Sequence, residues 1–477
     1  MSDSATPTPD PAAAPTADPE SLVLDAFGGR PHVPLETLMD GFVALHKNGH
    51  RQRTAGWLAM KAGSIGGSEI AALMGHNPYS SFDDVVGSKV GARTFEGNTA
   101  CRWGTLFESA IERFVETDCG TRLAGTDISV PAPGHSGLAG RHANSPDGYG
   151  VVTLYAAEGS EGEPEWRLLS TSAETRARAA GRRTKRVIAL FEFKCPYRRQ
   201  PKGGVPRHYK PQIWSGLALS PVAHLGIFVD AAFRKCALWS LGPGTGYDRT
   251  YHLEARVDRW TTPVAWGITG VYAPRLDAPR LDAPKSGAAD DDMGGGAPGA
   301  PDAAYAAWRL HGQNFGIPCR SPAEEARAGR PFAPDPIDFG DCEKDVFETM
   351  LLHLDGGGFR ATHQGPCFPD GRGAPLLTGV AIGAAVDRLA ADAPAHHYLL
   401  GVLPWKMFEV DYAFVERREG FLAEVGPLVH DCLDVAGRLQ KEKDPKRAYY
   451  KYLDEKRREK PRRGGEPAQL QDLFDLL

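Results

Sequence analysis

The sequence predicts an α/β protein: a central mixed β-sheet with helices on its faces, an insertion and flexible ends. A dense apolar run at 190–195, "LFEFKC", is typical of a buried strand. A turn at 145–148, "SPDG", leads into the β-branched and aromatic run "VVTLY" at 151–155, which predicts a second strand. Segments 101–116 and 208–220 have helical patterns. Strands that alternate with helices in this way favour an α/β fold.

The predicted strand at 190–195 carries two charged residues, Glu192 and Lys194. Side chains two positions apart share one face of a strand, so these two stand together. Phe191, Phe193 and Cys195 then pack on the opposite face. A carboxylate beside a lysine suits hydrolysis assisted by a divalent metal, in which the lysine steadies a water or a developing charge. A salt bridge at a strand end is the alternative for this pair taken alone.

Further polar residues lie on both sides of that strand in the sequence. Asp147 stands in the Pro-Asp-Gly turn, at the mouth of a hairpin whose second strand is predicted to be the charged one. Glu108 lies near the start of the helix predicted at 101–116, where an acid is often only a partner of the helix dipole. Tyr209 and Gln212 open the helix predicted at 208–220.

A glycine-rich stretch at 63–75, "GSIGGSEIAALMG", precedes all of these motifs. It predicts a turn with Ser68 at an N-cap and a helix that begins at Glu69. Backbone amides and the positive end of a helix suit a phosphate group. An ordinary capped helix is the alternative interpretation.

In this order, the motifs resemble the PD-(D/E)xK nuclease superfamily. More narrowly, they are similar to the branch with phage lambda exonuclease, the herpesvirus alkaline nucleases and YqaJ-type viral recombinases. The stretch 57–81 is similar to the N-terminal signature of that branch, and 401–437 resembles the C-terminal segment of YqaJ-like proteins from large DNA viruses. The resemblance covers about 56–242 and 400–439, and implies a restriction-endonuclease-like core.

The resemblance also implies a metal site. Its ligands would be Asp147, Glu192, the main-chain carbonyl of Phe193, and Glu108 either directly or through water. Lys194 would orient the nucleophilic water. Mg²⁺ is the expected cation because every donor is a hard oxygen, with Mn²⁺ as a second choice.

Contacts to DNA are implied at other positions. Lys61, Ser64, Ser68 and Tyr209 would bind phosphate or DNA, and Gln212 would contact the substrate or the attacking water. Lys61 departs from the pattern, because the lambda-type enzymes carry arginine there. Lysine supplies charge but lacks the planar two-point grip of arginine, which puts strong recognition of a 5′-phosphate in doubt.

A second departure is the long segment at 156–186, rich in polar and basic residues, between the Pro-Asp-Gly turn and the charged strand. It is interpreted as an extended hairpin or loop near the active site, with arginines that reach DNA.

Composition sets further bounds. The chain has 477 residues, enough for more than one domain, and 42% are hydrophobic, as in globular proteins. The net charge of −5 means that DNA binding must come from local patches. The eight cysteines have no CxxC spacing and no signal peptide precedes them, so reduced thiols are expected, with neither disulfides nor a zinc site. His142, His208, His396 and His397 lack ligand spacing and are interpreted as surface or core residues.

No apolar run approaches the length of a membrane span, so no membrane association is expected. The expected location is intracellular, with the nucleus or a viral replication site in an infected cell as candidates.

Composition also divides the chain. The repeat "APRLDAPRLDAP" and the stretch "GGGAPGAP" predict a linker, and a basic run follows the last predicted helix. The predicted segments are a disordered tail at 1–30, the first part of the core at 31–263, a low-complexity linker at 264–304, an insertion at 305–395, the completion of the core at 396–437, and a basic tail with an amphipathic peptide at 438–477.

That peptide, "AQLQDLFDLL" at 468–477, has a helical apolar stripe. Leu470, Leu473, Phe474 and Leu477 fall at positions i, i+3, i+4 and i+7. Ten residues are too few for a stable helix in water, so the stripe needs a surface. It either packs on its own domain or docks on a partner such as a sliding clamp or a single-strand annealing protein.

The function expected from the sequence is that of a metal-dependent DNA exonuclease. It would hydrolyse phosphodiester bonds at duplex ends, in viral or phage-type recombination or DNA processing. The alternatives are an endonuclease of restriction or repair type on the same core, and a DNA-binding module without catalysis.

Overall fold

The structure is a computed structural model. It describes residues 33–47, 51–52, 54–94, 97–157, 165–201, 203–244, 246, 262–274, 335–356, 359–375 and 377–459. The predicted tail at 1–30, most of the predicted linker, the first part of the insertion and the C-terminal peptide lie outside these residues.

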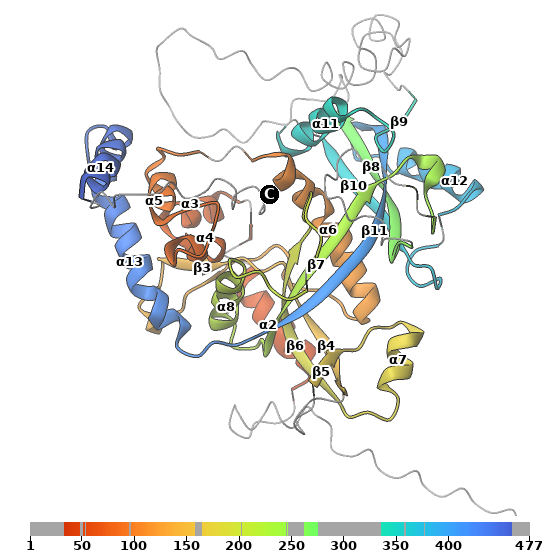
Figure 1. The fold of residues 1–477 in the computed structure, drawn as a ribbon, viewed down its shortest axis with the longest axis horizontal. Coiled ribbons are helices and arrows are strands. Elements are labelled where there is room, and N and C mark those ends of the chain that lie inside the picture. The colour runs from red at the N-terminus through yellow and green to blue at the C-terminus, as the bar shows by residue number, and fades with distance from the viewer. Residues whose placement is uncertain are drawn as a thin grey trace, which may run out of the picture.

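One mixed sheet of eight strands forms the centre of the molecule (Figure 1). Its order is β10-β8-β11-β7-β6-β4-β5, and β9 pairs with β11. The pairs β6–β7 and β9–β11 are parallel and the others are antiparallel. The strands are β4 (Gly148–Ala157), β5 (Glu165–Leu168), β6 (Thr184–Lys194), β7 (Leu225–Lys235), β8 (Ala265–Pro274), β9 (Ile337–Asp338), β10 (Arg360–Cys367) and β11 (His397–Glu416).

Helices cover both faces of the sheet, which confirms the predicted α/β class with a central mixed sheet. Alternate side chains of β6 divide between two cores, because successive residues of a strand point to opposite faces. Phe191 and Phe193 join one core with α6 (Thr99–Cys119) and α11 (Lys344–Gly356). Leu190 joins the other core, whose helices are α2 (Leu35–Lys47), α4 (Gly67–Leu73), α5 (Phe82–Val90), α8 (Lys210–Leu219), α13 (Phe421–Gln440) and α14 (Pro445–Glu459).

Smaller elements complete the described fold. A second sheet has the order β1-β3-β2. α12 packs over β8 and the first part of β11 in a third core. These elements are α3 (Ala55–Gly63), β1 (Ile65–Gly66), β2 (Val130–Pro131), η2 (Gly134–Ser136), β3 (His142–Asn144), α7 (Ala173–Ala179), η4 (Leu238–Ser240) and α12 (Val380–Ala391).

The predicted start of the linker at 264 is wrong. Residues 265–274 form β8, a buried strand between β10 and β11. Its glycines resemble a linker in composition, but they have a packing role: a side chain at Gly267 would lie 2.4 Å from the Trp405 ring. The predicted insertion at 305–395 also contributes β9 and β10 to the main sheet, so its described part extends the core.

The predicted place of segment 156–186 is wrong as well. β5 pairs with the last residues of β4, Leu154–Ala157, and α7 follows it. Asp147 precedes the first residue of β4, roughly 25–30 Å away at about 3.3 Å per residue. The turn with Asp147 precedes β4, and the segment with β5 and α7 follows the other end of β4. The arginines of this segment therefore lie far from Asp147.

Two glycines allow α4 and α8 to close on Asn144, just before the Pro-Asp-Gly turn. A Cβ at Gly67 would lie 1.6 Å from the Asn144 side-chain oxygen. A Cβ at Gly216 would lie 2.7 Å from its nitrogen and 2.6 Å from Leu190. The asparagine is buried, so neither helix has room to retreat without opening the core.

We expect Gly216→Ala to destabilise the protein by about 1–3 kcal/mol, because the added methyl overpacks a filled core. Gly437→Ala is the matched control: it also lies within a helix, and nothing stands within 4 Å of its Cβ position. It should stabilise the protein by about 0.5–1 kcal/mol through helix propensity. Thermal denaturation of both variants measures this, and equal midpoints would contradict the packing described.

Candidate active site

The antiparallel pairing of β4 with β6 brings the Pro-Asp-Gly turn beside the charged strand. The Asp147 amide donates to the Phe191 carbonyl at 3.2 Å. The Phe193 amide donates to Oδ2 of Asp147 at 2.5 Å. The predicted hairpin is therefore present, and the carboxyl group of Asp147 is fixed at the level of Glu192.

Glu192 and Lys194 share one face of β6, as strand geometry predicts. The Lys194 ammonium donates to Oε1 of Glu192, and the Glu192 side chain is only 1% exposed. Its second oxygen, Oε2, is buried and has no hydrogen-bond partner within the described part of the chain. An unpartnered carboxylate oxygen in a protein interior is costly, so it points to a ligand that the fold accommodates.

The negative charges of Glu192 and Asp147 are only partly balanced by the positive charge of Lys194. Burial raises the pKa of Glu192 to about 8, and the nearby Asp147 adds to the effect, while Lys194 opposes both. Burial likewise raises the pKa of Asp147, against the influence of Lys194. Burial alone would lower the pKa of Lys194, but its attraction to the two carboxylates raises it overall. The site would therefore gain from an added positive charge.

A cavity of about 880 Å³ opens over this site. Asp147, Phe193, Lys194, Tyr209 and Glu108 all contribute to its lining. Glu108 is the tenth residue of α6, because the helix begins at Thr99 and not at 101 as predicted. The helix dipole stabilises acids in the first turn of a helix, and Glu108 lies in the third turn. Interaction with the dipole therefore does not account for an acid at this position.

Of the residues predicted to bind DNA or phosphate, only Tyr209 lines that cavity. The predicted site residues that do not line it are Lys61, Ser64, Ser68, Gln212 and the buried Glu192. Ser64 is buried, and its hydroxyl donates to the Met60 carbonyl at 2.7 Å, which caps the end of α3. Lys61 stacks over the Trp57 ring at 4.8 Å. Ser68 is exposed in the first turn of α4.

The predicted N-cap at Ser68 is wrong. α4 begins at Gly67, and Gly66 occupies the N-cap position. The Gly66 amide donates to Glu69 at 2.7 Å, and Glu69 also forms an ion pair with Lys89 at 2.9 Å. The helix therefore begins earlier than predicted, since a glutamate side chain caps it from within its own first turn.

Several residues of the site escaped the sequence analysis. Arg199 lines the cavity and forms a two-point ion pair with Asp230, whose NH2–Oδ1 distance is 3.1 Å. Asp230 is 1% exposed and lies opposite Lys194 in the β6–β7 register. In the sequence, the acid within the apolar run "LGIFVDAAF" at 225–233 was the pattern that indicated a buried, paired carboxylate at Asp230. Tyr79, which is 68% exposed, also lines the cavity from the segment between α4 and α5.

Glu112 lies one helical turn after Glu108. Burial raises its pKa first, and the charges of Glu116 and Asp147 raise it further. A signal for Glu112 was its spacing of four residues from Glu108, which places both on one side of a helix.

The described residues contain no group of three or more histidine, cysteine or acidic side chains placed to hold a metal ion. The donors that the site does offer are all oxygens, and the buried Oε2 of Glu192 is free to accept. That donor set fits a hard divalent cation better than zinc.

The described histidines and cysteines favour no other centre. His142 is a core residue, as predicted: its ring bonds to the Ile65 carbonyl and the Ser215 hydroxyl, and burial lowers its pKa. His208 is half-buried and packs against the Tyr209 ring. The seven cysteines within the described ranges are free thiols. No helix among those ranges has the length and apolarity to cross a membrane.

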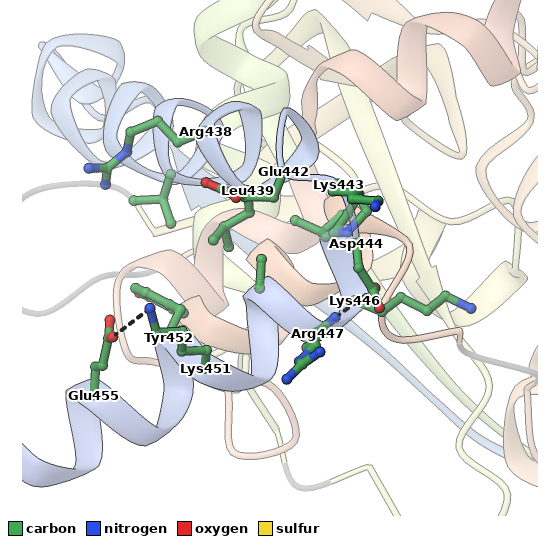
Figure 2. A pocket seen from close by; sticks show the side chains of 14 residues that line it. Arg438, Leu439, Glu442, Lys443, Asp444, Lys446, Arg447, Lys451, Tyr452 and Glu455 are labelled. Atoms are coloured by element: carbon green, nitrogen blue, oxygen red, sulfur yellow. Dashed lines mark hydrogen bonds and ion pairs between the residues drawn. The ribbon is translucent and has the colours of Figure 1, made fainter.

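A second groove lies elsewhere, between α13 and α14 (Figure 2). None of the candidate active-site residues lines it.

Comparisons with known proteins agree with the motif order. Residues 56–222 match the YqaJ-like viral recombinase domain. Protein D345L of African swine fever virus (strain Badajoz 1971 Vero-adapted) is 37% identical over 233 residues, which are 48% of this chain and 63% of that protein. The proteins of that name from the Pretoriuskop and Malawi tick isolates are 36% identical with the same coverage. The chain therefore spans less than two thirds of these relatives.

Among solved structures, LHK-Exo in complex with dAMP is similar at 20% identity, with a TM-score of 0.22. The match covers 37% of this chain and 73% of that one. Residues 56–222 include the Pro-Asp-Gly turn, the Glu192–Lys194 pair and all of α8. This part of the chain is therefore similar to the YqaJ-like viral recombinase domain, in agreement with the resemblance that the motif order predicted.

Proposed function

We propose that the chain is a metal-dependent deoxyribonuclease that degrades duplex DNA from its ends during viral or phage-type recombination. The observation that carries the proposal is the buried Glu192 carboxylate, with one oxygen held by Lys194 and the other without a partner, beside Asp147. The similarity of residues 56–222 to the YqaJ-like viral recombinase domain supports the proposal.

In this proposal the cation is Mg²⁺. Asp147, Glu192, the Phe193 carbonyl and Glu108 would hold it, the last either directly or through water. When bound, such a cation stabilises charge on a phosphate group and lowers the pKa of water. The bond from the Phe193 amide keeps the Asp147 carboxylate in place before any ligand arrives, which reduces the entropy cost of binding.

Lys194 has the role of orienting the attacking water. Its ammonium is anchored by Glu192 and lies 5.1 Å from the centre of the Tyr209 ring, so it has few alternative positions. A fixed cation at this point also stabilises negative charge that develops on the phosphoryl oxygens.

DNA would approach through the side of the cavity lined by Arg198 and Arg199. The two bonds to Asp230 fix the Arg199 guanidinium at the cavity wall, where it would bind a phosphate. Lys61 and Ser68 are exposed and would bind the terminal phosphate of a DNA strand. The Ser64 hydroxyl is already bonded to the Met60 carbonyl at the end of α3.

One incubation tests the proposal. End-labelled linear duplex and closed circular duplex are supplied together with Mg²⁺. We expect loss of the linear DNA and survival of the circle. Cleavage of the circle would instead establish an endonuclease, and binding without cleavage of either would establish a non-catalytic module.

We predict that Asp147→Asn, Glu192→Gln and Lys194→Ala each lower the cleavage rate by about 10²-fold or more, because each removes charge from the reacting centre. The two carboxylate variants should also lose Mg²⁺ affinity in calorimetric titration, and Lys194→Ala should keep it. Glu165→Gln is a matched control on the exposed strand β5 and should have no effect. Normal turnover by either carboxylate variant would contradict the assignment.

We also predict that Glu192→Gln stabilises the metal-free protein. The folded-state pKa of about 8 lies above the ordinary value of 4.5, so the folded state holds a proton that the unfolded state releases. Stability attributable to this group therefore falls as pH rises from about 4.5 to about 8. The variant cannot titrate there, so its advantage in melting temperature should grow over that range. Measurement in chelator between pH 5 and 8 tests this, and an advantage that is constant or shrinks with pH would refute it.

A further inference from the structure

The groove between α13 and α14 has a volume of about 1330 Å³ and is an integral part of the fold (Figure 2). α14 is fixed against α5, because Tyr449 is buried and its hydroxyl donates to the Asp83 carbonyl at 3.0 Å. Lys456 and the Tyr452 hydroxyl both bond to the Asp83 side chain, at 2.6 and 2.9 Å. The walls of the groove are therefore held by contacts that do not involve an occupant.

The floor of the groove is apolar and its rim is rich in cations. Val435, Leu439, Ala448 and Tyr452 contribute apolar surface. The cations that line it, labelled in Figure 2, are Arg438, Lys443, Lys446, Arg447 and Lys451.

Three acids also line the groove, Glu442, Asp444 and Glu455, against five cations, and two of these acids are already engaged. Asp444 accepts the Arg447 amide at 3.0 Å as the cap of α14, and Glu455 pairs with Lys451 at 3.6 Å. Within the described residues, the side chains of Arg438, Lys443, Lys446 and Arg447 have no carboxylate partner. The groove therefore suits a ligand with both an apolar face and negative charge.

The chain carries such a segment eight residues after the end of α14. In "AQLQDLFDLL" at 468–477, four apolar residues have helical spacing, and the acids are Asp472 and Asp475. We propose that this segment docks as a short helix in the groove between α13 and α14. Its apolar stripe would cover the floor and its acids would face the unpaired cations, which is the helix-in-groove mode of recognition.

The connecting residues are long enough. Eight residues, 460–467, separate the end of α14 from the segment, and they span up to about 27 Å when extended. The rise of α14 from Ala448 to its last residue is only about 17 Å. A tether of this length gives an effective concentration on the order of 1 mM, so a Kd near 0.1 mM would keep the groove about nine-tenths occupied.

The floor is mainly aliphatic, with Val435, Leu439 and Ala448, whereas a groove for a single nucleic-acid strand typically offers several aromatic side chains on which bases stack. The floor also gives the free ten-residue segment the surface that a helix of its length requires. This inference concerns a site apart from the cavity at Asp147 and does not depend on the proposed nuclease function.

The test uses fluorescence anisotropy with a labelled synthetic peptide of residues 468–477. We expect saturable binding to a chain that ends at residue 467, and at least tenfold weaker binding to the 477-residue chain, whose groove is already filled. Lys446→Glu with Arg447→Glu should weaken binding at least tenfold. A peptide with Asp472→Lys and Asp475→Lys should regain affinity for that reversed groove.

Arg176→Glu with Arg178→Glu in α7 is the control, since it makes the same change of charge on another exposed helix. Melting temperatures establish that each variant folds. Equal binding to the original and reversed grooves, or no binding at 1 mM peptide, would overturn the proposal. So would a groove that binds an oligonucleotide or another protein in preference to the peptide. No measurement here uses nuclease activity, so failure leaves the proposed function untouched.

Discussion

The antiparallel pairing of β4 with β6 is the constraint on which the candidate site depends. It aligns Gly148 with Phe191, and so it places the turn before β4 at the level of Glu192. Asp147 and Glu192 are neighbours only in the fold, because 44 residues separate them in the sequence. The same pairing sends the basic segment with β5 and α7 to the other end of the hairpin.

Placing two acids in this interior works against stability. Burial raises the pKa of both, and one lysine balances them only in part. The surrounding fold compensates with dense packing: Phe191 and Leu190, neighbours on β6, are each fully buried in a different core. A well-packed scaffold that tolerates an unfavourable polar centre is the arrangement expected where function requires it.

Local patterns predicted the elements with strong periodicity. The strand after the Pro-Asp-Gly turn and helices α6 and α8 were predicted within a few residues, whereas β6 was predicted from its apolar run and begins six residues earlier, at Thr184. β8 was missed because its glycines answer to distant neighbours: Gly267 leaves room for the Trp405 ring, on a strand more than a hundred residues away in the sequence. The ion pair between Arg199 and Asp230 was missed for the same reason: the pattern of each segment alone does not reveal which charges the fold brings together. The start of α4 was misplaced because glutamate, and not serine, provides its cap.

The position of β11 has a consequence for how the chain is made. Val415 pairs with Gly226, which lies 189 residues earlier (415 − 226), and β11 also pairs with β8 along its first half. β11 lies between β7 and β8, so the middle of the sheet stays open until this late strand has been synthesised. At about 5–20 residues per second, a ribosome needs roughly 10–40 s to cover that interval. During this time β7 presents an unpaired, apolar edge, which is a site at which nascent chains can aggregate before the sheet closes.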